Sequence, residues 1–294
     1  MKKKFRLFSI LTLVLVGLGV GLYYYIQNVA ESGFNNWVYE KRNEFTLKHE
    51  TLKIDYFPPS VTLTNVEYEP KSGGSYFIKE ARLYSWDFNH EPPEKMRAEF
   101  DGVNYNGALP LVARQAIAQL TGVQKLPSVD LRLDYNLDAS RDLLHINDIT
   151  LILPKVGDFS VTGYMDNVKF GKAAQISNLG MAIRSGSLTF VDKGFYTSFS
   201  QRLAKMSGKD VEVVIDEIRS GLMEERAKYL EMKDMTTVHA IDGIVEFIDV
   251  PVGMTFRVAP EEAFPLLYLF SDRDMLDFAD QLKLSVQAHM PPIQ

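Results

Sequence analysis

The strongest constraint on the fold is a stretch in which apolar and polar residues alternate. Residues 129–138 read VDLRLDYNLD, with a large apolar side chain at every second position. Successive side chains of a β-strand point to opposite faces, so this period predicts a half-buried strand. The alternation therefore favours a sheet with one apolar face and one face in water.

Two further strands are expected to continue this sheet. The segment 144–153 begins in phase with the first strand and ends in the opposite phase, which predicts a β-bulge near Asn147 and Asp148. A third strand, 159–166, follows Pro154 and Gly157. The three together predict an antiparallel meander with one apolar and one wet face.

The apolar face of this meander is the candidate binding surface for an apolar ligand. Its expected residues are Leu131, Leu133, Leu151, Leu153, Phe159 and Val161. Two interpretations stay open, because such a face is more often a core closed by helices than a surface left free for a ligand.

The rest of the chain divides by pattern. Turn-forming glycine and proline pairs interrupt a strand-rich region over 47–107. Within it large side chains recur at every second residue and are expected on one sheet face: Arg82, Tyr84, Trp86 and Phe88. Residues 109–120 have the spacing of a short amphipathic helix. Helical patterns dominate after residue 192, and a final strand is expected at 282–288.

The fold class predicted from these patterns is α+β. It has an N-terminal transmembrane helix, followed by a mostly antiparallel, curved β-sheet packed against helices concentrated in the C-terminal third. The expected division is a cytoplasmic tip and anchor over 1–26 and a helical stalk over 27–46. One periplasmic domain is expected over 47–294, strand-rich to 191 and helix-rich from 192.

The predicted anchor rests on an uncharged stretch. Residues 7–26 read LFSILTLVLVGLGVGLYYYI, and about 20 residues of helix match a hydrocarbon core of roughly 30 Å. The expected membrane-anchor residues are Leu7, Leu11, Leu15, Leu18, Leu22 and Ile26. The basic residues before this stretch and the acidic chain after it predict a single pass of the bacterial inner membrane, with a cytoplasmic N-terminus. A cleaved signal peptide is the alternative, but no A-x-A-like site follows.

The distribution of charge argues against one class of partner. Lys2, Lys3, Lys4 and Arg6 contribute +4 to a net charge of −6, so the rest of the chain carries −10. Nucleic-acid binding requires a cluster of Lys and Arg, and none follows Arg6. Nucleic acid is therefore not an expected partner.

A search for chemistry finds no motif. The chain has no cysteine, which excludes thiolate metal sites, and its five histidines lack a second histidine at ligand spacing. The sequence RSGSL around Gly186 lacks the G-x-S-x-G of a nucleophile elbow. We therefore expect no enzyme, no cofactor and no metal.

Two stretches carry a family resemblance. SLTFVDKGFYTSFSQRLAKMSGK, at 187–209, and FIDVPVGMTFRVAPEEAFP, at 247–265, resemble uncharacterised membrane-anchored envelope proteins of bacteria. The order of an anchor, VTLTNVEYEP and VDLRLDYNLD is similar to that of AsmA-like envelope proteins. That resemblance implies an extended β surface offered to lipids, although this body is shorter and more helical at its C-terminus.

The leading functional hypothesis is a non-enzymatic periplasmic protein of envelope biogenesis or maintenance that binds, or helps to move, a lipid or another apolar ligand. The alternative is an assembly module that recruits an envelope protein partner. A hydrolase of envelope polymers is a distant third hypothesis, supported only by the expected location.

Overall fold

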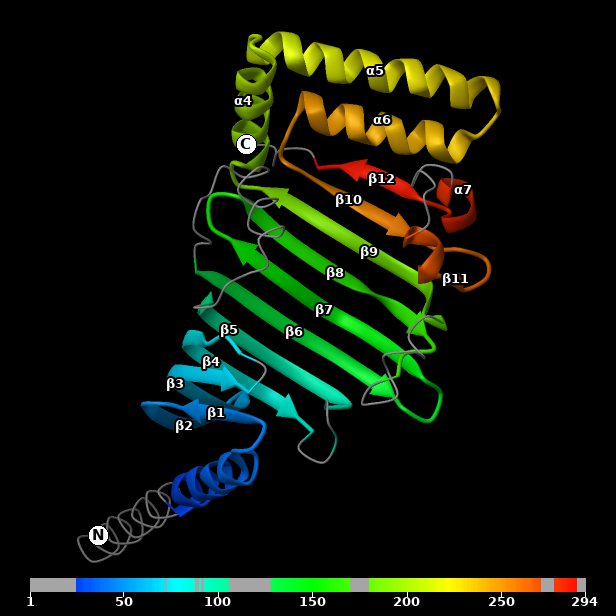
Figure 1. The fold of residues 1–294 in the computed structure, drawn as a ribbon. Helices are drawn as coiled ribbons and strands as arrows, with labels where there is room; N and C mark the ends of the chain where they lie inside the picture. The colour runs from blue at the N-terminus through cyan, green and yellow to red at the C-terminus, as the bar shows by residue number, and fades with distance from the viewer. Residues whose placement is uncertain are drawn as a thin grey trace, which may run out of the picture.

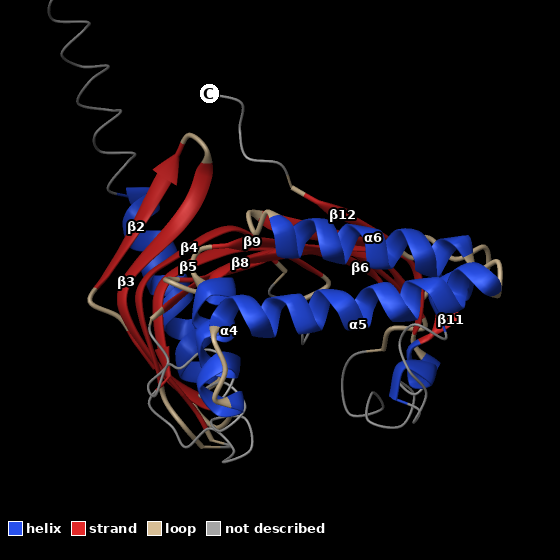
Figure 2. Cartoon of the chain, turned by 90° about the horizontal axis from the view of Figure 1, so that it is seen from above, coloured by secondary structure: helices blue, strands red, loops and turns tan. Residues whose placement is uncertain are grey.

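The computed structural model describes residues 25–71, 73–87, 90, 93–105, 128–169, 180–270 and 278–289. These residues form one 12-stranded sheet with the strand order β1-β3-β4-β5-β6-β7-β8-β9-β10-β12, while β2 pairs with β3 and β11 pairs with β9. Every pair is antiparallel. Figure 1 shows β1–β3 at one end of the sheet and β10 and β12 at the other, and the sheet is visibly curved in Figure 2.

The strands are mostly long and follow one another in a meander. Their bounds are β1 Phe45–Lys48, β2 Thr51–Tyr56, β3 Pro59–Pro70, β4 Tyr76–Trp86, β5 Lys95–Tyr105, β6 Val129–Asp138, β7 Leu143–Leu153, β8 Gly157–Asp166, β9 Ala182–Asp192, β10 Gly253–Val258, β11 Phe264–Pro265 and β12 Ser285–Ala288. The strand predicted at 129–138 is confirmed as β6. The predicted helix at 109–120 lies outside the described residues.

The pairing register gives the sheet two chemically different faces. Directly paired residues share a face, and a row of such pairs crosses the sheet with one apolar residue from each of β2 to β10 and from β12. This row is Leu52, Leu63, Ala81, Phe100, Leu131, Leu151, Phe159, Phe190, Met254 and Ala288. A second apolar row lies beside it: Ile54, Val61, Leu83, Ala98, Leu133, Ile149, Val161, Leu188, Phe256 and Val286.

The opposite face is polar across the same strands. Its matching row is Lys53, Thr62, Arg82, Glu99, Arg132, Thr150, Ser160, Thr189, Thr255 and Gln287. Hydroxyl groups bond across neighbouring strands of this row, as in the pair Thr150 and Ser160 with an Oγ1–Oγ distance of 2.7 Å. The predicted separation into an apolar and a wet face is therefore confirmed, and it extends well beyond the three strands from which it was predicted.

Two β-bulges change the sheet face to which the following side chains of a strand point. In the β6–β7 pair Asp134 pairs with Asp148 but Tyr135 pairs with Ile146, so the bulge predicted at Asn147 and Asp148 is confirmed. In the β4–β5 pair the register shifts between Leu83 and Ser85. This second shift turns Trp86 onto the apolar face, so the prediction that Trp86 shares a face with Arg82 was wrong. Phe88, expected on the same face, lies outside the described residues.

Three helices between β9 and β10 gather at the β12 end of the sheet (Figure 1). They are α4 Phe195–Ser207, α5 Val211–Glu231 and α6 Met235–Asp249, and two short elements, η2 Leu266–Phe270 and α7 Ala279–Leu282, follow β10. Phe247 of α6 packs on Phe190 and Ala288 in a buried cluster with Phe159, Phe195 and Met254 around it. The helices therefore cover the first apolar row where it crosses β9, β10 and β12.

Helix α6 passes so close to β12 that only glycine fits at residue 243. A Cβ at Gly243 would lie 2.3 Å from the carbonyl oxygen of Val286. Gly243→Ala should therefore push α6 off the sheet and lower the free energy of unfolding by about 1–3 kcal/mol, the usual effect of overpacking.

Urea unfolding measures this change, and Gly221→Ala in α5 is the matched control. A Cβ at Gly221 would meet nothing within 4 Å, so that substitution should stabilise the helix by about 0.5–1 kcal/mol. Equal losses in the two variants would contradict the close approach of α6 to β12.

The N-terminal helix corrects the predicted fold class. Among the described residues no helix is both long and apolar enough to cross a membrane. The helix over residues 25–40 is polar on one side, where Asn28, Glu31 and Asn35 are exposed, and half-buried on the other, where Ala30 and Phe34 lie. The predicted fold class, in which a transmembrane helix precedes the sheet, was therefore wrong: the described helix before the sheet, over residues 25–40, is not a membrane-spanning helix.

Of the six predicted anchor residues, the structure describes Ile26. Leu7, Leu11, Leu15, Leu18 and Leu22 lie outside the described residues, and Ile26 lies half-buried in the first turn of the helix over residues 25–40. That helix sits beside β1 and β2 at the end of the sheet opposite α4–α6 (Figure 1).

Candidate site: an apolar groove between the N-terminal helix and the sheet

The N-terminal helix is tied to the free edge of β2 by one side chain. The side-chain Nε2 of Gln27 donates to the backbone carbonyl oxygen of Leu52, and the backbone N–H of Ile54 donates to the side-chain Oε1 of Gln27 at 3.0 Å. The side-chain amide thus pairs with the strand as a neighbouring backbone would. Further along the helix Asn35 bonds to His49, with an Oδ1–Nε2 distance of 3.3 Å.

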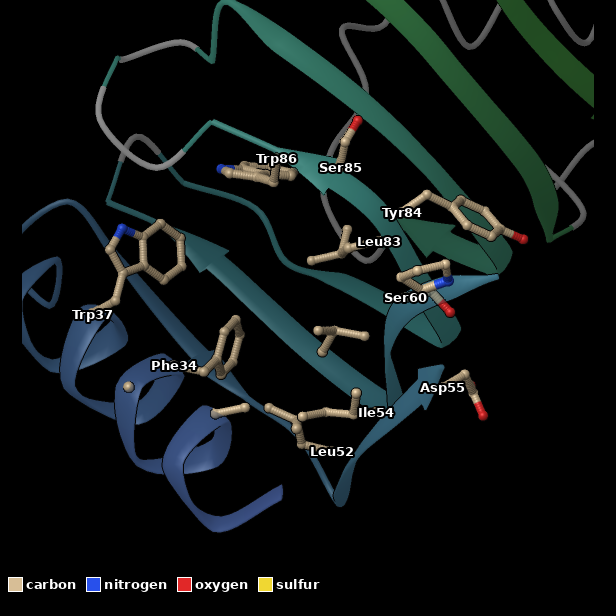
Figure 3. Close-up of a pocket in the computed structure, with 14 residues that line it drawn as sticks. Phe34, Trp37, Leu52, Ile54, Asp55, Ser60, Leu83, Tyr84, Ser85 and Trp86 are labelled. Atoms are coloured by element: carbon tan, nitrogen blue, oxygen red, sulfur yellow. The ribbon is translucent and has the colours of Figure 1, made fainter. Parts of the chain in front are cut away.

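Aromatic side chains of the helix face the sheet. Figure 3 shows Phe34 and Trp37 pointing from the helix toward Leu83 and Trp86 of β4. Phe34 and Trp37 contact each other with ring centroids 5.8 Å apart. Phe34 also packs against the buried cluster of Leu52, Leu63, Val66 and Ala81, so the helix rests on the apolar rows where they cross β2–β4.

Two hollows lie between this helix and the sheet. The first has a volume of about 650 Å³ and is lined mainly by the helix and by β2–β4. The second, of about 700 Å³, extends over β1 and β3–β6. The two hollows are adjacent, because both are lined by Phe34, Trp37, Leu83 and Trp86, and we call the pair of hollows the groove. Each hollow is within the size range of small-molecule sites.

The predicted ligand contacts divide into two groups. Leu131 and Leu133 line the second hollow of the groove. Leu151, Leu153, Phe159 and Val161 lie on the same sheet face farther toward β8, in register with them. All six side chains are half-buried, and Phe159 stacks on Phe190 with ring centroids 4.8 Å apart.

Sequence reasoning missed most of the groove's aromatic residues. Phe34 and Trp37 were assigned to a stalk, and Trp86 to the face of Arg82. The i, i+3 spacing of Phe34 and Trp37 is a signal for a helix face that packs on something apolar, but it does not identify the partner. A row of three tyrosines, one on each of β3, β4 and β5, was also missed. The ring centroids of Tyr68 and Tyr76 are 6.0 Å apart, and those of Tyr76 and Tyr105 are 4.8 Å apart.

The groove carries little charge. Asp55 lines the first hollow and Glu44 the second, and the described lining of both contains no Lys or Arg. A hydrogen bond from Lys53 at 2.6 Å holds the pKa of Asp55 below its ordinary value, so this carboxylate stays ionised at neutral pH. Burial, with Tyr76 and Glu44 nearby, raises the pKa of Tyr68, which keeps this phenol neutral.

Comparison with known proteins adds a match over one part of the chain. A family model described as "Uncharacterized protein" matches residues 150–289. No curated protein matches the chain. The matched segment runs from the middle of β7 to the end of β12 and contains the helices α4–α6. The groove lies outside this segment.

One group of side chains near the groove could coordinate a cation. Ligand atoms of Asp87, His90 and Glu94 lie within 4.8 Å of one another, and His90 also lines the second hollow. Sequence reasoning looked for a second histidine and so missed this arrangement. The His90 ring is already bonded to Asp87, with an Nδ1–Oδ2 distance of 2.6 Å.

The pKa of His90 is raised by this hydrogen bond to Asp87 and by the nearby Glu94 carboxylate. Protonated His90 therefore stabilises the folded chain. This stabilisation is fully present at pH values below the pKa of histidine in the unfolded chain, about 6.5, and it is lost as the pH rises through the higher pKa of His90 in the folded chain. His90→Gln should therefore lower the melting temperature at a pH of about 5.5 and leave it nearly unchanged at about 8.5. An equal decrease at both values would contradict the ion pair.

Proposed function

We propose that this protein is a non-enzymatic binding protein for a lipid or another molecule with a long hydrocarbon chain, which lies in the groove along the apolar rows of the sheet. The observation that carries the proposal is the pair of adjacent, aromatic-lined hollows, the second of which reaches Leu131 and Leu133. Apolar pockets with few polar groups are typical of small-molecule sites.

The burial of the apolar rows supports this proposal over a core closed along its whole length. At one end Leu52, Leu63 and Ala81 are buried, and at the other end Phe190 and Ala288 are buried. Between them Phe100, Leu131, Leu151 and Phe159 are only half-buried. A chain leaving the groove would therefore meet a continuous apolar path, because the rows cross β5–β8 without a polar residue.

Intrinsic fluorescence offers a direct test. The chain has two tryptophans, and both Trp37 and Trp86 line the groove. Vesicles of phosphatidylcholine with brominated acyl chains should quench their emission, whereas unbrominated vesicles of the same lipid should not. Trp37→Phe and Trp86→Phe each leave one reporter, and each single-tryptophan protein should still be quenched.

Native mass spectrometry of gently purified protein provides a second measurement. A bound species with the mass of a lipid should be present and should disappear after delipidation. Absence of quenching in both single-tryptophan proteins, together with repeated absence of a lipid adduct, would reject the proposal.

A second candidate function, recruitment of a protein partner, is favoured by the outer surface of α5. Val213, Met223 and Leu230 are exposed along this helix, at a spacing that places them on one side. In-cell cross-linking through this surface distinguishes the two functions, because a stoichiometric protein partner without bound lipid would favour recruitment.

A periplasmic location and a likeness to envelope proteins accompany the proposed function as predictions from the sequence. Cell fractionation with protease added to intact spheroplasts tests the location. Degradation of the β-sheet domain, with cytoplasmic markers intact, is the expected result, and a protected domain would contradict it.

A further inference from the structure

The hairpin of β2 and β3 ends in an exposed apolar turn. Phe57 and Pro58 form this turn between the paired residues Tyr56 and Pro59, and we call residues 56–59 the hairpin tip. Phe57 is 97% exposed, and Figure 2 shows the tip projecting beyond the neighbouring strands β4 and β5. Pro58 and Pro59 have no backbone N–H, so the tip has few donors that require water.

The N-terminal helix begins at the same end of the molecule as the hairpin tip. Gln27, in its first turn, is bonded to Ile54 near the end of β2, whereas Asn35 is bonded to His49, just before β2 begins. The helix therefore runs along β2 with its first residues toward the tip. Tyr25, in the first turn of the helix, is 66% exposed.

The two segments that form this end of the molecule are uncharged. Residues 25–30 and 56–66 contain no Asp, Glu, Lys, Arg or His. Val29 adds an exposed apolar side chain to the helix. The nearest charges of β2 are those of Lys53 and Asp55, which pair with each other at 2.6 Å. This end therefore offers apolar and aromatic groups without the charged rim that a protein partner usually meets.

The sequence before the helix supports one kind of partner. Residues 7–26 contain no charged residue, and Ile26 lies in the first turn of the helix, so this apolar sequence joins the described chain beside the tip. Exposed aromatic side chains free of charge are typical of the boundary between water and a bilayer.

We infer that the hairpin tip inserts into the surface of a lipid bilayer, with Phe57 as the inserting side chain. Burial of one phenylalanine favours the membrane by about tenfold to a hundredfold, which is enough to orient the sheet on the bilayer. The contact does not require a ligand in the groove. It places the first hollow close to the lipid, because Pro59 and Ser60 line that hollow.

The absence of cysteine from the chain permits a direct test. Phe57→Cys and Met232→Cys each introduce one thiol into the full-length protein, and the thiol is labelled with the environment-sensitive dye nitrobenzoxadiazole. Met232 is 70% exposed at the C-terminal end of α5, and α5 lies at the opposite end of the sheet (Figure 1). Phosphatidylcholine vesicles should increase the emission at position 57 and shift it to shorter wavelength, but leave position 232 unchanged.

A second set of variants tests Phe57 without a dye attached to it. The dye is placed at the exposed helix position by Val29→Cys, and Phe57 is then changed to aspartate or to leucine. Phe57→Asp should abolish the shift that vesicles cause at position 29, because a carboxylate resists transfer out of water, whereas Phe57→Leu should keep it. Circular dichroism and thermal melting check that each variant is folded.

The outcomes are distinct from those for the groove. Equal responses at positions 57 and 232, or a full shift at position 29 in folded Phe57→Asp protein, would overturn the inference. A response that requires added membrane proteins would overturn it as well, in favour of a protein partner. A response at position 57 without quenching of Trp37 and Trp86 by brominated lipid would support membrane contact while counting against the proposed function.

Discussion

Phe190→Ala should lower the free energy of unfolding by about 3–5 kcal/mol, the range typical of a buried phenylalanine reduced to alanine. Phe190 is only 7% exposed and lies where the sheet meets two helices. Its ring centroid is 4.8 Å from that of Phe159, 5.8 Å from Phe195 and 6.1 Å from Phe247. The substitution removes all three ring contacts and leaves a cavity that these rigid neighbours fill poorly.

Equilibrium unfolding in urea measures this loss, and Leu188→Ala is the matched control. Leu188 lies two residues away on the same strand and the same face, but it is 41% exposed. The control should therefore lose much less stability than Phe190→Ala. Similar losses at the two positions would show that the cluster around Phe190 is not the core of this end of the sheet.

Leu133→Glu should reduce affinity for a brominated long-chain lipid by at least about tenfold, because a carboxylate in an apolar site loses hydration without a partner. Leu133 lines the second hollow and pairs with Ala98 and Ile149 in the second apolar row. Tryptophan quenching measures the affinity in the variant, since Trp37 and Trp86 are unchanged.

Leu230→Glu is the control for this variant, because it makes the same change at an exposed position of α5. It should leave quenching unchanged. Leu131→Gln is a milder second variant that preserves neutrality, and it should weaken binding to a smaller extent. Full binding by folded Leu133→Glu protein would show that the ligand does not lie along this row.

The sequence predicted the sheet well where the signal is local. Alternation over 129–138 reports which side chains share a face, and the change of phase at Asn147 locates an irregularity, since both depend only on neighbouring residues. The order of the strands and the helices that cover each end depend on contacts between distant segments. Hydropathy and charge patterns alone do not determine these contacts.

The candidate site was only partly predictable for the same reason. Leu131 and Leu133 were expected on the apolar face, and they line the groove. Trp86 was assigned to the wrong face because one additional residue in β4 reverses the alternation. Phe34 and Trp37 were assigned to a stalk because nothing local shows that their helix packs on β2–β4.

The pairing of Gln27 with β2 has a consequence for association between molecules. An uncovered edge strand presents unpaired N–H and C=O groups to which a strand from another chain can add. Gln27 occupies two such groups, on Leu52 and Ile54, and its helix stands beside them. Release of this helix would therefore free these two backbone groups of β2 to pair with a strand of another molecule, which favours aggregation through this edge.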